Sequence, residues 1–252
     1  MKIVIAIKQV PSRDSLLRVN AESSWIEDSD LSFEINEPDA YALEAGLQLR
    51  ESQGGEVVVL CAGPDRATQT IREALAKGAD RAIHVECGDS ASDPLALSRM
   101  LASALEGEQP DLVLTGIQSD DLGYGQTGVI LAELLGLPHA TLIMNVETCE
   151  GGIRVRRELE DGWCQNVEMS LPALLTIQSG ATRLRYATLM GIKKAKTKEI
   201  RVVSPEGVPQ AAIAVSRLYL PPKTKQSQIF DGAPKEAAAK LVEKLRFEAR
   251  VI

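Results

Sequence analysis

The feature of this sequence that most constrains its fold is the alternation of short apolar runs with helical patterns over the first two-thirds of the chain. Four runs rich in Val, Ile or Leu show almost no polar alternation: residues 2–7, 56–61, 81–85 and 111–115. Such runs are typical of strands that are covered on both faces of a parallel sheet. The repetition predicts an α/β fold, a doubly wound, mostly parallel, Rossmann-like sheet with right-handed crossovers.

Helical patterns separate these predicted strands. One follows Asn36–Asp39 and extends to Glu51, a second follows Gly63-Pro64-Asp65 and ends at Lys77-Gly78, and a third follows Ser92-Asp93-Pro94. A glycine just past the last periodic residue and a proline at the first helical position are the usual boundary signals. The strands are therefore expected to be joined by helices.

The pattern changes after about residue 150. Apolar and polar residues alternate over residues 153–159 and 163–169, and Asp161-Gly162 lies between them, which predicts a β-hairpin addition. Residues 171–177 form one more apolar strand. Beyond residue 180 there is little periodicity until a helix predicted from residue 234 to about residue 248. We expect residues 1–180 to form the globular domain and residues 181–252 to form an extended arm that ends in a helix.

The composition excludes several classes of protein. The chain has 252 residues, with 28 Lys and Arg against 35 Asp and Glu and a net charge of −7. This charge argues against nucleic-acid binding, and no apolar run approaches the ~20 residues that cross a bilayer. The amino terminus does not resemble a signal peptide, and four cysteines without C-x-x-C spacing favour reduced thiols. We expect a cytoplasmic protein without membrane insertion.

The charge is unevenly distributed along the chain. Residues 181–225 hold ten Lys and Arg against two acidic residues, a net charge of +8, which leaves −15 for the rest. Leu189, Met190 and Ile192 lie among these basic residues. A solvated face and a nucleic-acid site are the alternatives, but apolar residues set among basic ones favour docking on an acidic protein, and Tyr186 alone could stack on a base.

Catalytic motifs are weakly represented. Neither His84 nor His139 has a metal-ligand spacing, and the sequence contains no P-loop and no G-x-S-x-G nucleophile elbow. We expect both histidines to be structural or at the surface, the cysteines to fill the core, and the chain to have no catalytic residues and no metal site.

The strongest local motif is the glycine-rich stretch of residues 116–128, which follows the fourth predicted strand and precedes a helical pattern at residues 129–135. It contains G-x-G-x-x-G, but dinucleotide folds place this motif after their first strand, and a simple glycine-rich turn is the alternative. Glycines at a helix start still allow a phosphate to reach the free N–H groups. Ala6 and Ala62 end two neighbouring strands and leave room for a flat ring, and Asn36–Asp39 could join the same crevice. We predict a nucleotide pocket without catalytic groups.

Together these pieces resemble the β subunit of electron-transfer flavoproteins over nearly the whole chain. The segments that carry the resemblance are residues 4–8, 36–39, 44–45, 63–64, 71–80, 116–128, 171–173, 185–189 and 193–196. The resemblance implies an electron carrier and not an enzyme. It also implies a heterodimer with an α subunit, one FAD held mainly by the α subunit, and a structural AMP in the β subunit, with the arm at residues 181–252 packed on the partner.

The resemblance also implies roles for individual residues. AMP would be contacted by Ala6, Asn36, Glu37, Pro38, Asp39, Ala62, Gly116, Gln118, Ser119, Asp120, Asp121, Gly123, Tyr124, Gly125, Gln126 and Thr127. Partner recognition would involve Arg185, Tyr186, Leu189, Met190, Ile192, Lys193, Lys194 and Lys196. In this family, the residue that matches Leu189 inserts into a hydrophobic pocket of an acyl-CoA dehydrogenase or a similar flavoprotein dehydrogenase. The expected process is fatty acid oxidation, in the bacterial cytoplasm or in the mitochondrial matrix.

Two alternatives concern the ligand, and one concerns regulation. Bifurcating relatives hold a second FAD in place of AMP and have a loop like D-x-D-T-x-Q-V-G, whereas this chain lacks the Asp-Thr pair and has Thr127 in place of Val. An NAD-dependent oxidoreductase needs an acidic residue about 20 positions beyond the glycines, which Glu147 matches, but no general base accompanies it. A nucleotide-binding regulatory module would leave the basic segment without a role. AMP is therefore favoured.

Overall fold

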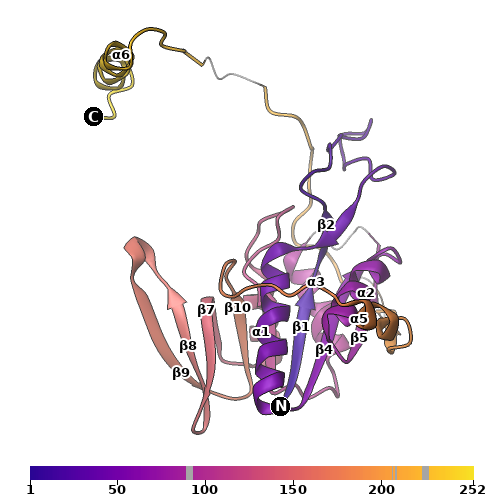
Figure 1. The fold of residues 1–252 in the computed structure, drawn as a ribbon. Helices are drawn as coiled ribbons and strands as arrows, with labels where there is room; N and C mark the ends of the chain where they lie inside the picture. Colours follow the sequence, from indigo (N-terminus) through magenta and orange to yellow (C-terminus); the bar gives the residue numbers. More distant parts are fainter. Residues whose placement is uncertain (89–92, 206, 208, 223–226) are drawn as a thin grey trace. The chain divides into compact units, whose positions relative to one another are not determined.

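The computed structural model describes residues 1–88, 93–205, 207, 209–222 and 227–252, and it divides into two compact units, residues 1–218 and 219–252. The first unit contains a sheet with the strand order β11-β5-β4-β1-β6-β10-β7-β8-β9 (Figure 1). Its strands are β1 (Lys2–Ile7), β4 (Glu56–Gly63), β5 (Arg81–Glu86), β6 (Leu112–Gly116), β7 (His139–Cys149), β8 (Gly152–Glu158), β9 (Cys164–Ser170), β10 (Ala173–Ile177) and β11 (Ile200–Val203). Its helices are α1 (Glu37–Gln53), α2 (Ala67–Lys77), α3 (Pro94–Ala104), α4 (Thr127–Leu135) and α5 (Leu189–Ala195).

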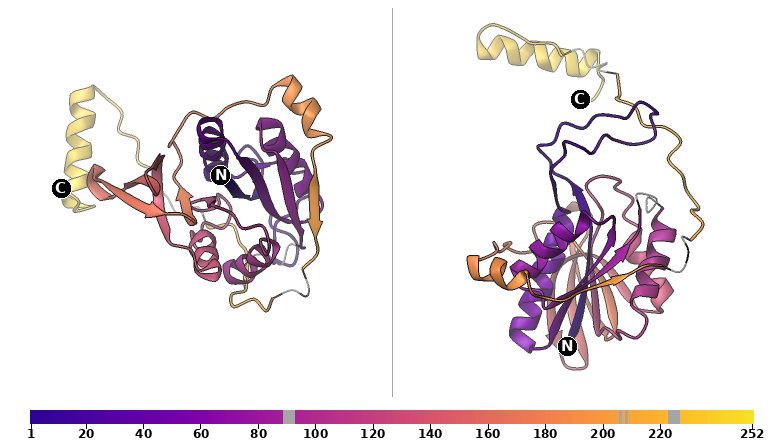
Figure 2. Two further views of the ribbon diagram at one scale, coloured as in Figure 1. Left: turned by 90° about the horizontal axis from the view of Figure 1, so that it is seen from below. Right: turned by 90° about the vertical axis from the view of Figure 1, so that its right-hand side faces the viewer.

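The sheet is parallel from β11 to β7, and only β8 and β9 run antiparallel to their neighbours. Helices α1 and α2 cover one face, and α3 and α4 cover the other (Figure 2). Successive residues of β1 point to opposite faces, so Ile3 and Ile5 pack in the core under α1 and α2, while Val4 packs in the core under α3 and α4. The predicted doubly wound α/β fold is confirmed.

The order of the strands reverses beside β1. From β1 the chain continues to β4 and β5 on one side, and then returns to β6 on the other side of β1. In open sheets of this kind, ligands bind outside the carboxyl ends of the strands at the point of reversal. The ends of β1 and β6 are therefore where a site is expected.

Several elements match the sequence predictions, and several were missed. The hairpin is present as β8 and β9, joined by the 3-10 turn η1 (Glu160–Gly162). Strand β7 was not predicted, because Asn145, Glu147 and other polar residues interrupt its apolar pattern. Strands β2 (Gln9–Pro11) and β3 (Phe33–Ile35), which pair with each other in a separate two-stranded sheet, are too short to show a periodicity.

The segment between residues 181 and 218 belongs to the first unit, whereas the domain boundary was expected at residue 180. The reason is that β11 pairs with β5 at the edge of the sheet, and α5 packs on α2 through the buried Ala195. Neither element was predicted, because β11 has only four residues and α5 only seven. The second unit contains α6 (Pro234–Phe247), close to the predicted helix, and none of its side chains is buried.

Among the described residues, no helix combines the length and the apolar character that a membrane span requires.

Candidate functional site

A cavity of about 120 Å3, partly open to solvent, lies at the carboxyl ends of β1, β4 and β6. The cavity is lined by Ala6, Ile7, Lys8, Asn36, Asp39, Ala62, Pro94, Leu97, Leu101, Thr115, Gly116, Ile117, Gln118, Ser119, Leu122, Tyr124, Gly125, Gln126, Thr127 and Gly128. The structure thus brings residues from five separate parts of the chain together at the predicted edge of the sheet.

Most of the predicted site residues line this cavity. They are Ala6, Asn36, Asp39, Ala62, Gly116, Gln118, Ser119, Tyr124, Gly125, Gln126 and Thr127. The others, Glu37, Pro38, Asp120, Asp121 and Gly123, are outside the lining. Sequence reasoning missed the apolar wall that α3 contributes through Leu97 and Leu101. The available signal was that α3 begins at Pro94 just after the carboxyl end of β5, which directs its first turns to the same edge.

Asp39 joins the two strands at the point of reversal. Its Oδ1 accepts the N–H of Gly116 at 2.8 Å, and its Oδ2 accepts the N–H of Lys8 at 2.8 Å. Gly116 ends β6 and Lys8 follows β1, so one carboxylate holds both chain segments where they enter the cavity. Asp39 is only 6% exposed, and burial raises its pKa to about 7 although the two N–H bonds favour the ionised form.

This raised pKa predicts a specific pH dependence of stability. The ordinary pKa of Asp39 is 3.8, so the folded chain binds its proton more tightly than the unfolded chain does between about pH 4 and about pH 7. The contribution of Asp39 to the free energy of unfolding therefore falls as the pH rises through that window, by up to about 1.4 kcal/mol per unit. Asp39→Asn should remove this slope from urea unfolding measured over the same range; parallel curves for the two proteins would contradict the assignment.

Asn36 fixes the loop that follows β6. Its Nδ2 donates to the carbonyl oxygen of Gln118 at 2.9 Å, and its Oδ1 accepts the N–H of Asp120 at 2.9 Å. At Gly116, the approach of α1 leaves no room for a side chain, because a Cβ there would lie 2.4 Å from Oδ1 of Asp39. Asn36 and Asp39 are almost fully buried, and their side chains form hydrogen bonds with backbone groups of the neighbouring segments.

The two acidic residues of the loop are paired with cations from elsewhere in the chain. Asp121 lies 2.7 Å from Nζ of Lys8, and Asp120 lies 3.2 Å from Nη2 of Arg13, which also pairs with Glu37. Burial alone would raise the pKa of Asp121, but the Lys8 ammonium together with hydrogen bonds from Ser119 and the N–H of Leu122 outweighs it, and the pKa lies below its ordinary value. Each of the two loop carboxylates thus has a cation beside it, which reduces the repulsion of a bound anion nearby.

The amino terminus of α4 opens into the cavity. The helix starts at Thr127, and Gln126, Thr127 and Gly128 all line the cavity. In the described part of the chain, no side chain caps the first turn of α4. Free N–H groups and the helix dipole at such an end attract phosphates. A Cβ on Gly128 would lie 2.6 Å from Oγ1 of Thr115, so glycine permits α4 to pack closely on β6.

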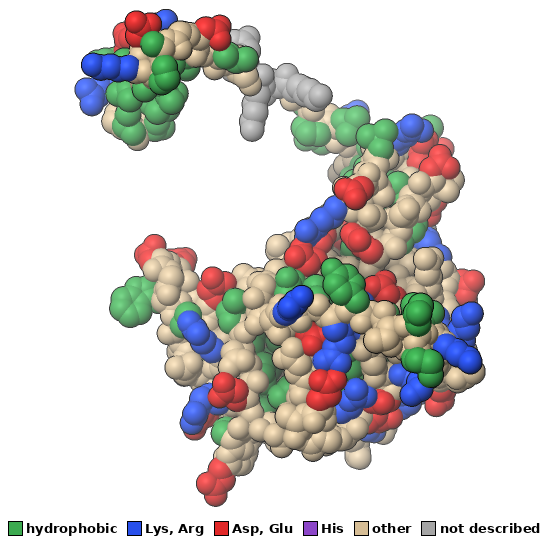
Figure 3. Space-filling model, viewed as in Figure 1, with side chains coloured by type: hydrophobic (Ala, Val, Ile, Leu, Met, Phe, Trp, Pro, Cys, Tyr) green, Lys and Arg blue, Asp and Glu red, His purple; other side chains and the backbone are tan. Residues whose placement is uncertain are grey.

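A second feature is an exposed apolar surface on residues 185–196, which we call the docking segment. Its side chains Tyr186 and Leu189 are 92% and 87% exposed, and Met190 and Ile192 are also exposed. Apolar side chains and lysines lie next to one another over α5 (Figure 3). Large apolar side chains surrounded by charge are typical of a surface that binds another protein.

The chain is similar over most of its length to proteins of one family. The electron transfer flavoprotein domain family matches residues 24–207. The chain is 37% identical to the electron transfer flavoprotein subunit beta of Methylophilus methylotrophus, over 96% of this chain and 97% of that one. It is 36% identical to the corresponding subunits of Bradyrhizobium diazoefficiens and of rice mitochondria, over the full length of each.

This chain belongs to the electron transfer flavoprotein β-subunit family. Membership implies an α subunit as its partner and a flavin in the complex that the two subunits form. The resemblance drawn from the sequence motifs is thus confirmed.

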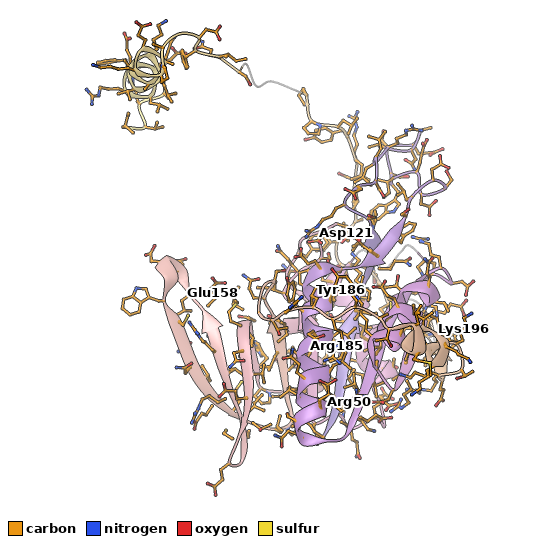
Figure 4. All side chains as sticks on the ribbon, in the orientation of Figure 1. Arg50, Asp121, Glu158, Arg185, Tyr186 and Lys196 are labelled. Carbon is orange, nitrogen blue, oxygen red and sulfur yellow. The ribbon has the colours of Figure 1, made fainter. Side chains whose placement is uncertain are left out.

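Within this β subunit, Arg185 is directed toward its own chain. It donates to both oxygens of Glu44, at 2.7 and 2.9 Å, and to Glu51 at 2.5 Å, and both glutamates belong to α1. Figure 4 shows Arg185 in front of α1, with Tyr186 beside it and Lys196 on the far side of the docking segment. Arg185 was predicted to recognise a partner, but its guanidinium is engaged in anchoring the docking segment.

The remaining candidates for chemistry occupy unremarkable surroundings in this electron transfer flavoprotein chain. His84 is buried, with Nε2 donating to the carbonyl oxygen of Gly63 at 3.0 Å, and His139 is exposed. Cys61 and Cys87 fill the core as predicted, but the prediction is wrong for Cys164, because most of β9 is exposed. No three His, Cys, Asp or Glu residues in the described ranges are grouped so that they could hold a metal ion.

Proposed function

We propose that this chain is the AMP-binding β subunit of a heterodimeric electron transfer flavoprotein. The observation that carries the proposal is the cavity at the β1/β6 reversal, which combines apolar walls with an uncapped helix amino terminus. FAD, held mainly by the α subunit, supplies the redox chemistry. The β subunit contributes a structural nucleotide site, a docking surface for an acyl-CoA dehydrogenase or similar dehydrogenase, and residues 219–252 as an arm on the α subunit.

The two ends of the cavity suit the two ends of an adenine mononucleotide. Ala6 and Ala62 leave space beside the strands, and Leu97 and Leu101 supply an apolar wall for a flat base. The start of α4 supplies N–H groups for the phosphate, and the side chains of Gln126 and Thr127 add donors. The one buried carboxylate that lines the cavity, Asp39, is occupied by two backbone N–H groups. This arrangement supports nucleotide binding.

The identity of the released nucleotide tests this proposal. The heterodimer, produced by co-expression with its α subunit, should release about one AMP and about one FAD on denaturation, as measured by chromatography against standards. A second FAD in place of AMP would indicate the bifurcating type. NAD, or the absence of any adenine nucleotide besides one FAD, would contradict the proposed site.

The proposed docking surface for an acyl-CoA dehydrogenase would let the protein accept electrons from fatty acid oxidation. The docking segment offers exposed apolar residues with Lys193, Lys194 and Lys196 around them. A small apolar anchor binds weakly and releases quickly, while the lysines increase the encounter rate with an acidic partner. This combination suits a carrier that must leave each donor after one transfer, in the cytoplasm of a bacterium or in the mitochondrial matrix.

A further inference from the structure

The docking segment lies against the carboxyl end of α2 with almost no space between the backbones. A Cβ on Gly191 would lie 2.3 Å from the carbonyl oxygen of Ala76, so the approach requires glycine. Thr188 begins α5 by accepting the N–H of Gly191 on its Oγ1 at 3.0 Å. A helix of seven residues is too short to be stable by itself, so α5 depends on these contacts with the domain.

Two cations connect the carboxyl ends of α2 and α5, one from each segment binding carbonyl groups of the other. Arg72 of α2 donates to the carbonyl oxygens of Ala195 at 2.6 Å and Lys198 at 2.7 Å. Lys198 in turn donates through Nζ to the carbonyl oxygens of Leu75, at 3.0 Å, and Ala79. Carbonyl groups at a helix carboxyl end lack intrahelical partners, and a cation there is also favoured by the helix dipole. Each helix end is therefore closed by a cation from the other segment.

Fixing a segment before it binds changes the free energy of docking. Ordering a loop on binding costs about 1–2 kcal/mol per backbone residue, in addition to the immobilised side chains. Leu189 and Met190 project from α5, the helix whose carboxyl end Arg72 closes, with 87% and 63% of their surfaces exposed. Held in place, they bind a partner without this cost.

We propose that Arg72 and Lys198 are positioning residues for partner docking, which hold α5 in the conformation that presents its apolar side chains. The proposal rests on the docking role proposed for this segment. Both side chains are half-buried and directed into their own chain, so they act through Leu189 and its neighbours and not by contacting the partner.

The test compares Arg72→Gln with Lys77→Gln in the complete heterodimer. Lys77 lies on the same helix and pairs with Glu73, so its replacement removes the same charge but leaves the hydrogen bonds of Arg72 to Ala195 and Lys198 in place. For Arg72→Gln we expect amide hydrogen exchange over residues 189–195 to become about tenfold faster. With an acyl-CoA dehydrogenase that reduces the unaltered heterodimer, KM should rise about fivefold at unchanged kcat. Arg72→Lys, which can reach one carbonyl, should be intermediate, and Lys77→Gln should behave as the unaltered protein.

Several outcomes would overturn the proposal. One is unchanged exchange in Arg72→Gln, and another is faster exchange with an unchanged KM. Leu189→Ala, measured in parallel, tests the docking role of the segment separately from the positioning role of Arg72 and Lys198. An unchanged KM in that variant would contradict the docking role itself. If Arg72→Gln does not assemble, Lys198→Gln removes the other half of the connection and is read in the same way.

Discussion

Replacing Asp39 with alanine is expected to deplete the heterodimer of AMP and to destabilise the β subunit. The substitution removes both acceptors that Asp39 provides and leaves the N–H groups of Gly116 and Lys8 without their partner. A buried donor that loses its acceptor costs about 1–3 kcal/mol. Since removing the carboxylate also relieves the cost of burying its charge, we expect a net loss of about 3 kcal/mol in urea unfolding.

The effect on the nucleotide should exceed that of a general loss of stability. The two freed N–H groups belong to the chain segments that leave β1 and β6 at the mouth of the cavity. Small displacements of binding groups weaken binding strongly. We expect the AMP content per heterodimer to fall at least about tenfold, measured by chromatography after denaturation, while the flavin content stays the same.

Asp111 provides a matched control at the opposite edge of the sheet. Its Oδ2 accepts the N–H of Lys2 at 2.6 Å, so it connects the amino ends of β1 and β6 as Asp39 connects their carboxyl ends. Asp111→Ala should therefore reduce stability and leave the AMP content unchanged. Retention of AMP in Asp39→Ala at the level of the unaltered protein would contradict the role assigned to Asp39. Asp39→Asn, which keeps one acceptor, covers the case in which the alanine variant fails to assemble.

The central strands were predictable because their signal is local. Residues of β1 and β4 are apolar without interruption, since one side of each strand packs under α1 and α2 and the other under α3 and α4. Strand β11 has no such signal. It has four residues, lies at the edge of the sheet, and exposes Arg201 and Val202, so only its pairing with β5 shows that it is a strand.

The candidate site was predictable to the extent that topology alone determines it. Ala6 and Ala62 end neighbouring parallel strands, so their place beside the cavity followed from the strand assignments. Leu97 has the spacing of an ordinary core residue, and only the position of α3 turns it toward the cavity. The orientation of Asp120 and Asp121 depends on cations more than 100 residues earlier in the chain. Contacts at that separation leave no trace in a single sequence.

The same limit applied to the docking segment. Its mixture of basic and apolar residues indicated a binding surface, and Leu189 is indeed exposed. The sequence did not show which basic residues anchor the segment and which are free to bind a partner. Arg185 differs from the others only because α1 places Glu44 and Glu51 opposite it. Within one charged run, anchoring residues and recognition residues differ only in their tertiary partners.

Leu189→Ala is expected to weaken docking on an acyl-CoA dehydrogenase by about 30-fold. The side chain is 87% exposed in the free subunit, and burying its three extra carbon groups in an apolar pocket is worth about 2 kcal/mol. In a steady-state assay with a dehydrogenase that reduces the unaltered heterodimer, KM should rise by this factor. AMP and FAD contents should remain unchanged, because neither the cavity nor the anchors of the docking segment involve Leu189.

Leu16→Ala is the control, since Leu16 is 75% exposed but lies in the connection between β2 and β3 and not on α5. It should leave KM unaltered. Ionic strength separates the apolar anchor from the surrounding charge, because salt screens the lysines and not a buried leucine. Leu189→Ala should therefore keep the salt dependence of the unaltered protein, while replacing Lys193, Lys194 and Lys196 with glutamine should reduce it. A Leu189→Ala protein that docks normally would contradict the docking role of Leu189. Loss of flavin in this variant would show that the segment serves assembly of the heterodimer and not recognition of the dehydrogenase.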